Sequence, residues 1–159
     1  MLSMENSVFC ETDVHSYGSQ LRVVYNQVIL SLPITNSKES FIVLRKIWDA
    51  ELIAIQEQVY ILFLNANSQL IAYRCLHTGT TSQSMFDIKL ALACALGCLA
   101  KKIIIAHNHP SGNLRPSTGD ILITEQLNDA CELMDIDLKD HLIISANDYY
   151  SFKDNSLVF

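Results

Sequence analysis

The stretch that decides the fold is KKIIIAHNHPSGNLRPSTGD, residues 101–120. Its first part, Lys102 to Ala106, contains three consecutive isoleucines and is typical of a short buried β-strand. Asn, Pro, Ser and Gly then dominate up to Gly119, which is the only dense turn chemistry in the chain. Ser117 is a typical residue to cap a helix, so a helix is expected from there to about Met134. The stretch therefore predicts a strand, a turn-rich loop and a helix.

Two histidines and one aspartate in this stretch have the spacing of a metal site. In extended backbone alternate side chains share a face, so His107 and His109 are expected to direct both imidazoles at one point. Asp120 follows Ser117 by one helical turn, and a loop that folds back brings its carboxylate to the same point. Two imidazoles and one carboxylate leave a fourth tetrahedral position for water. This is the arrangement of a catalytic rather than a structural zinc ion.

A base and an oxyanion donor are also predicted. Zinc lowers the pKa of a bound water from ~15.7 towards ~7, and a nearby carboxylate then takes the proton and passes it to the leaving amine. Glu57 is the candidate, because it comes just before a strand expected over residues 59–64. If that strand is the neighbour of the His107 strand in the sheet, Glu57 lies beside His107. The hydroxyl of Ser117 is expected to donate to the developing oxyanion. Together these residues predict amide-bond hydrolysis.

Each of these residues also has a structural interpretation. Ser117 and Asp120 fit a plain capping box, and Glu57 alone fits a solvated charge at the end of a strand. His141 follows Asp140 into an apolar strand and is expected to be a hydrogen-bonded structural histidine. The complete pattern H-x-H-P-x-G-x-x-x-P-S-x-x-D favours the metal site, because all seven of its specified positions are satisfied at fixed spacing.

The rest of the chain predicts one α/β domain built around a single mixed sheet. Residues 1 to about 18 are expected to be a loose lead-in, so that residues 1–35 hold this lead-in and a first strand, and residues 36–159 hold the domain. Strands are expected over residues 21–32, 59–64, 70–76, 102–106, 138–145 and 149–152, and helices over residues 36–50, 87–99 and 117–134.

Composition narrows the function classes. Hydrophobic residues make up 50% and charged residues 18%, which favours a compact soluble fold over disorder. The net charge of −6 disfavours direct, phosphate-driven binding of nucleic acid. There is no apolar run of about 18–20 residues and no secretory signal, so a cytoplasmic protein without a membrane anchor is expected. The five cysteines form no C-x-x-C pair, and Cys94 and Cys98 are expected to be packing residues.

From about residue 36 onward the sequence resembles the JAMM (MPN-type) metalloprotease superfamily, and more closely its bacterial RadC-like branch. The histidine motif is the most specific part of this resemblance, and four further segments support it. The matching segments are residues 57–60 (EQVY), 78–80 (TGT), 106–112 (AHNHPSG), 116–120 (PSTGD) and 140–144 (DHLII).

The resemblance implies a cytidine-deaminase-like mixed sheet sandwiched by helices. It also implies zinc held by His107, His109 and Asp120, with Glu57 as acid and base and Ser117 near the oxyanion. Superfamily relatives cleave isopeptide or peptide bonds, so a protein or peptide substrate is implied, and a homodimer stays open.

The RadC-like branch is traditionally labelled as DNA repair. Longer relatives carry an N-terminal helix-hairpin-helix module suited to DNA, and the roughly 35 residues before the matching region are expected to be too few for it. A DNA-repair-associated factor and a non-catalytic protein-interaction module are the alternatives to a hydrolase.

Overall fold

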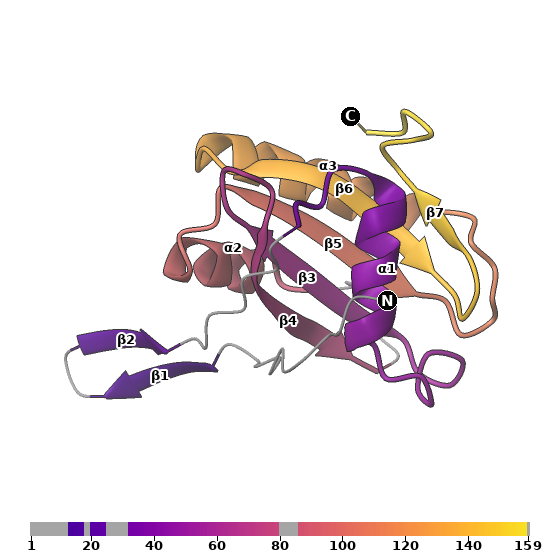
Figure 1. Cartoon of the computed structure of the whole chain (residues 1–159), viewed down its shortest axis with the longest axis horizontal. Coiled ribbons are helices and arrows are strands. Elements are labelled where there is room, and N and C mark those ends of the chain that lie inside the picture. The colour runs from indigo at the N-terminus through magenta and orange to yellow at the C-terminus, as the bar shows by residue number, and fades with distance from the viewer. Residues whose placement is uncertain (1–12, 18–19, 25–31, 80–85, 159) are drawn as a thin grey trace.

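The computed structural model describes residues 13–17, 20–24, 32–79 and 86–158. Its main body is a five-stranded mixed sheet with strand order β4-β3-β5-β6-β7 and helices on both faces (Figure 1). The elements of this body are α1 (Ser37–Ile47), β3 (Gln58–Leu64), β4 (Leu70–Thr78), α2 (Ile88–Gly97), β5 (Lys102–Asn108), α3 (Thr118–Leu133), β6 (Asp137–Ile144) and β7 (Tyr149–Ser151).

The segment before α1 differs in part from the sequence-based prediction. β1 (Asp13–Tyr17) pairs antiparallel with β2 (Gln20–Val24), and the two form a separate two-stranded sheet. The prediction of a loose lead-in is therefore wrong for residues 13–17, where polar residues interrupt the apolar ones and hide the strand from a search for apolar runs. The strand predicted over residues 21–32 is found as far as Val24, and residues 25–31 lie outside the described residues.

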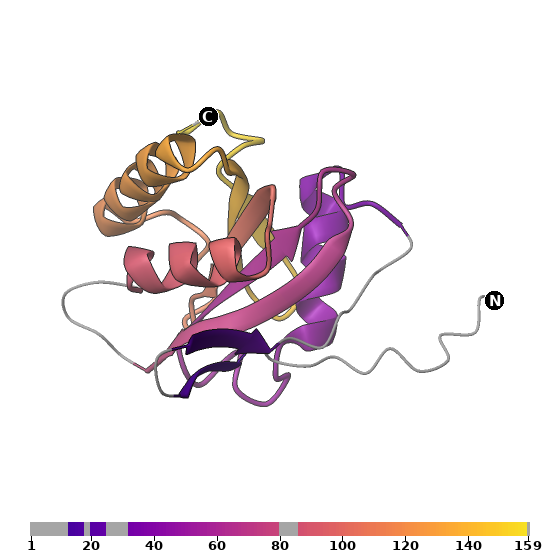
Figure 2. The same cartoon turned by 90° about the vertical axis from the view of Figure 1, so that its left-hand side faces the viewer.

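Helices cover both faces of the large sheet, as the fold prediction requires. Figure 2 shows α1 on one side of the sheet and α2 and α3 on the other. Side chains alternate along β3, so Ile61 and Phe63 pack towards α2 and α3, while Leu62 and Leu64 pack towards α1. This explains why the sequence of β3 is apolar on both faces. Among the described residues, none of the helices has the length and apolar character needed to cross a bilayer.

Cys94 and Cys98 are packing residues, as predicted. Cys94 and Cys98 of α2 are buried, and Cys131 of α3 is fully buried in the same cluster. Burial raises the pKa of Cys98 to about 11 and that of Cys131 to about 12. Since a thiolate is the reactive form of cysteine, these thiols are chemically inert at neutral pH.

The pairing of β5 decides where the functional residues meet. β5 runs antiparallel to β3 and parallel to β6, and α3 is the crossover between β5 and β6. His107 is paired with Val59 on one side and with Ile143 on the other. The start of β3, the ends of β5 and β6 and the start of α3 therefore lie at one end of the sheet.

Candidate metal centre

His107 is fully buried near the end of β5, on the face of the sheet that α3 covers. Its neighbour Val59 belongs to the core under α2 and α3, and directly paired residues have their side chains on the same face. His109 follows just beyond the strand and is partly exposed. A turn then closes at Gly112, whose N–H donates to the carbonyl of His109 over 2.9 Å and whose φ of +76° suits glycine.

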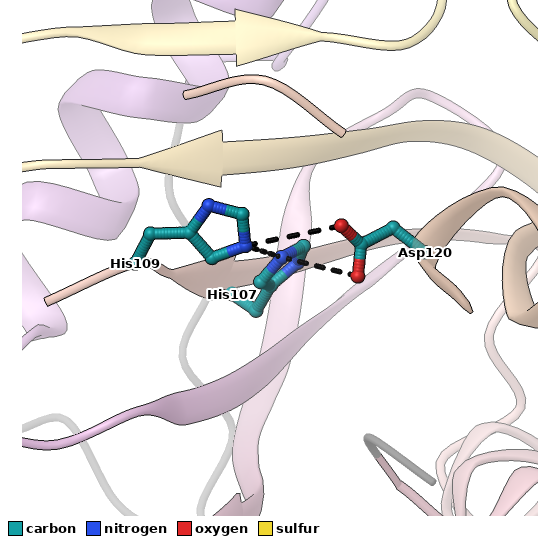
Figure 3. A group of neighbouring side chains, drawn as sticks. All are labelled: His107, His109 and Asp120. Carbon is teal, nitrogen blue, oxygen red and sulfur yellow. Dashed lines mark hydrogen bonds and ion pairs between the residues drawn. The ribbon is translucent and has the colours of Figure 1, made fainter. Parts of the chain in front are cut away.

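His107, His109 and Asp120 converge as the spacing predicts (Figure 3). Nε2 of His107 lies 2.9 Å from Nε2 of His109. The carboxylate oxygens of Asp120 lie 3.6 Å from Nε2 of His107 and 3.8 Å from Nε2 of His109. Tetrahedral bonds of ~2.0–2.2 Å place neighbouring ligand atoms about 3.3–3.6 Å apart, and the observed separations lie on both sides of this range. Small side-chain shifts would let the three residues hold a metal ion.

The ring of His109 presents a lone pair to this point. Its Nδ1 lies 2.5 Å from the carbonyl oxygen of Asn113. A carbonyl oxygen only accepts hydrogen bonds, so Nδ1 of His109 carries a proton and donates it. In the neutral ring Nε2 is then unprotonated.

A hydrogen-bonded chain fixes the ring of His107 in the same way. Thr124 of α3 donates its hydroxyl proton to the carbonyl of Asp120, so its oxygen accepts the Nδ1 proton of His141, 2.6 Å away. Nε2 of His141 then accepts from Nδ1 of His107 over 2.8 Å. Burial lowers the pKa of His107 to about 4 and holds the pKa of His141 well below its usual range, so both rings are neutral at pH 7.

The two lone pairs require a positive charge between them. Nε2 of His107 and Nε2 of His109 face each other beside the buried carboxylate of Asp120. Two lone pairs at 2.9 Å repel, and burial strengthens the repulsion because the local dielectric constant is low. A proton on His109 or a bound cation removes it, and a divalent metal also neutralises the carboxylate.

Asp120 is both a capping residue and a member of this group. Its Oδ2 accepts from the N–H of Ser117 over 2.7 Å, and its own N–H donates to the Ser117 hydroxyl oxygen over 3.1 Å. The capping box is therefore present, as its sequence predicts. It does not compete with metal binding, because it orients the carboxylate while Oδ1 faces His107.

Glu57 lies at the same end of the sheet as His107, two residues before its partner Val59. It immediately precedes β3, and its carbonyl accepts from the N–H of Gly79 over 2.9 Å. The alternation of β3, continued one residue before Gln58, predicts that Glu57 lies on the face of the sheet that also carries His107. Its half-buried side chain is not a member of the three-residue group, and its role as a base stays a prediction.

Sequence reasoning predicted a structural, hydrogen-bonded role for His141, and its two ring contacts agree with that role. Thr124 was missed. The available signal was its position four residues after Asp120, which places both on one face of α3.

The fold and the His-His-Asp group together define an α/β domain of the JAB/MPN-like class. The chain belongs to the RadC-like family within it: the family model described as the RadC-like JAB domain matches residues 34–157. Among curated proteins, the chain is similar to a UPF0758 protein of Streptococcus suis, with 42% identity over 101 residues that cover 64% of this chain and 41% of the relative. A UPF0758 protein of Streptococcus sanguinis is 39% identical over 101 residues, covering 64% and 44%. The chain thus spans less than half the length of these relatives.

Proposed function

We propose that this chain is a zinc-dependent hydrolase that cleaves a peptide or isopeptide bond in a protein or peptide substrate. The observation that carries the proposal is the convergence of two imidazole nitrogens and one carboxylate at a single point. Three protein ligands with one open position are the donor set of catalytic zinc sites, and closed structural sites use four.

The residues of the chain divide the chemistry between them. When bound, zinc supplies a Lewis acid that lowers the pKa of a coordinated water and polarises the scissile carbonyl. His107, His109 and Asp120 would hold the ion. Glu57 takes the proton from the attacking water and delivers it to the leaving amine. The Ser117 hydroxyl, whose oxygen already accepts from the N–H of Asp120, keeps its own proton free to donate to the developing oxyanion.

The experiment that tests the proposal measures zinc content and turnover in the same preparations. Protein purified without chelator is analysed by mass spectrometry for bound metals. It is then incubated with a library of fluorogenic peptides and lysine-isopeptide substrates. We expect one zinc per chain, and we expect Glu57→Gln to keep the zinc and to lose the hydrolysis.

The competing hypotheses give different results. Protein without stoichiometric zinc at pH 7 contradicts the metal centre, and hydrolysis by Glu57→Gln at the wild-type rate removes Glu57 from its role. Full zinc content with no turnover on any probe supports a non-catalytic interaction module. A nucleic-acid-associated factor predicts DNA binding that weakens steeply with added salt, and absence of binding at low salt contradicts it.

A further inference from the structure

The residue between the two histidines, Asn108, makes three hydrogen bonds from a fully buried side chain. Its Oδ1 accepts from the backbone N–H of Gln58 over 2.7 Å. Its Nδ2 donates to the backbone carbonyls of Ile53 over 2.7 Å and of Gln56 over 2.8 Å. Ile53 and Gln56 lie in the segment that leads into β3 and Gln58 is the first residue of β3, all some fifty residues earlier in the chain. The side chain therefore joins the end of β5 to the approach of β3.

Two of these partners flank the proposed base. Gln56 precedes Glu57 and Gln58 follows it, so the peptide groups on both sides of Glu57 are bonded to one side chain. Asn108 is itself adjacent in the chain to His107 and to His109. One amide group thus fixes the backbone of Glu57 relative to both histidines of the metal centre.

The approach to β3 buries few side chains, although backbone hydrogen bonds close turns within it and the Glu57 carbonyl accepts from the N–H of Gly79. Among residues 49–57, Ile53 is the only one whose side chain is buried. Segments with few buried contacts open locally at low free-energy cost. The hydrogen bonds of Asn108 are therefore a large part of what orders this segment next to the metal centre.

Only asparagine fits these partners. The site needs one acceptor and two donors at the length of a short side chain. Aspartate lacks the donors and would place a charge opposite two carbonyls. Serine and threonine offer a single donor, and leaving buried carbonyls unpaired costs about 1–3 kcal/mol each. The sequence His-Asn-His thus alternates two metal-facing residues with one residue that faces the approach to β3.

We propose that Asn108 is a positioning residue that sets the carboxylate of Glu57 at the metal centre. The inference rests on the proposed function, because it needs Glu57 to act as the base. Asn108 touches neither substrate nor metal, and it acts by restricting where Glu57 can be. A displacement of about 1 Å costs up to ~100-fold in rate when a catalytic group depends on its placement.

The test compares Asn108→Ala with Glu57→Gln, with both changes together, and with a matched control. Asn65→Ala is the control, because Asn65 also makes three hydrogen bonds, to Asn67 and Gln69, but at the opposite end of β3. Zinc content, hydrogen exchange of residues 54–58 and the visible spectrum of cobalt-substituted protein are measured for each. Turnover is measured on the peptide or isopeptide probe that the wild type cleaves.

We expect Asn108→Ala to keep its zinc, to exchange faster over residues 54–58 and to lose about 10- to 100-fold in kcat with little change in KM. The double variant should be no slower than Glu57→Gln alone, since Asn108 acts only through Glu57. The cobalt spectra of Asn108→Ala and Glu57→Gln should change in the same direction. Asn65→Ala should match the wild type in all these measurements.

Loss of zinc in Asn108→Ala, or rate losses that multiply in the double variant, would overturn the inference, because Asn108 would then act through the histidines or the whole fold. If Asn108→Ala is isolated unfolded, Asn108→Ser is measured in its place. A wild-type rate and a wild-type cobalt spectrum in Asn108→Ser would also overturn the inference. Unchanged turnover in Glu57→Gln would instead contradict the proposed function. The exchange of residues 54–58 would still report whether Asn108 orders the segment.

Discussion

The hydroxyl oxygen of Thr124 lies 2.6 Å from Nδ1 of His141, and this contact joins α3 to β6 behind the metal centre. The same hydroxyl donates to the carbonyl of Asp120. α3 therefore supplies one candidate ligand directly and orients a second, His107, through His141. Partners of this kind fix the tautomer and the direction of a ligating imidazole.

Replacing Thr124 with valine should weaken metal binding while keeping the shape of the side chain. The change removes the acceptor for Nδ1 of His141, so His107 loses its fixed tautomer. We expect zinc affinity to fall about 10- to 100-fold, measured by competition with a chromogenic chelator. Thr118→Val is the matched control, because Thr118 is exposed at the start of the same helix. Equal affinities in the two variants would contradict the orienting role of Thr124.

Removal of the metal should lower the melting temperature. A ligand that binds only the folded state stabilises it by about 4 kcal/mol when its concentration is 1,000 times the Kd. For a chain of this size each kcal/mol is worth roughly 2–4 °C. The melting temperatures measured by calorimetry with zinc and with chelator should therefore differ by about 8–16 °C. His109→Ala should show no such difference, and a chelator effect that persists in this variant would place the metal elsewhere.

Asp140 should make the stability depend on pH. Burial raises its pKa to about 6, against hydrogen bonds from Ser151 and Lys153 that lower it. The folded state thus keeps the proton more tightly than the unfolded state does. This stabilising contribution is complete below about pH 4 and is lost as the pH rises through about 6, with a magnitude of at most about 3 kcal/mol.

Asp140→Asn cannot lose a proton, so its unfolding free energy relative to the wild type should increase between pH 4 and pH 7. Urea denaturation across this range measures the difference. Asp137→Asn is the control on the same strand, because Asp137 is half exposed and its surface ion pair with Lys139 is worth only ~0–1 kcal/mol. A difference in unfolding free energy between Asp140→Asn and the wild type that stays constant with pH would contradict the raised pKa of Asp140.

Leu127 should be the main apolar anchor of α3. It is fully buried in the core between the sheet and α2 and α3. Leu127→Ala should lower the unfolding free energy by about 2–5 kcal/mol, since it removes buried methyl groups and leaves a cavity. Leu122→Ala, on the exposed face of the same helix, should cost much less. Urea denaturation that gives similar losses of unfolding free energy for Leu127→Ala and Leu122→Ala would show that α3 does not pack as described.

The large sheet and the three converging side chains were predictable because local rules decide them. Alternation along β5 gives His107 and His109, and the capping position of Ser117 gives Asp120. The apolar runs and caps also predict the order of the main-body helices and strands. Each of these signals lies within a few residues of the feature that it predicts.

The missed features depend on pairing between distant segments. The partners of Asn108 come from residues 53–58, and no sequence pattern around Asn108 predicts them. The contact between Thr124 and His141 depends on how α3 lies across β6. An irregularity in the pairing of β5 with β6, after Ile103, also sets which residue faces His141, and single-sequence periodicity does not reveal such a shift.

The register that pairs Val59 with His107 also limits which changes in length the molecule tolerates. An in-frame insertion of one residue after Val59 would leave both histidines in place but turn Glu57 to the side of the sheet under α1, because successive strand residues face opposite ways. If the proposed function holds, such an insertion should leave zinc binding intact and abolish hydrolysis. An insertion in the turn at residues 65–68, at the far end of β3, would not change the face that Glu57 occupies, although it would disturb the hydrogen bonds of Lys102 to Ala66 and Ser68.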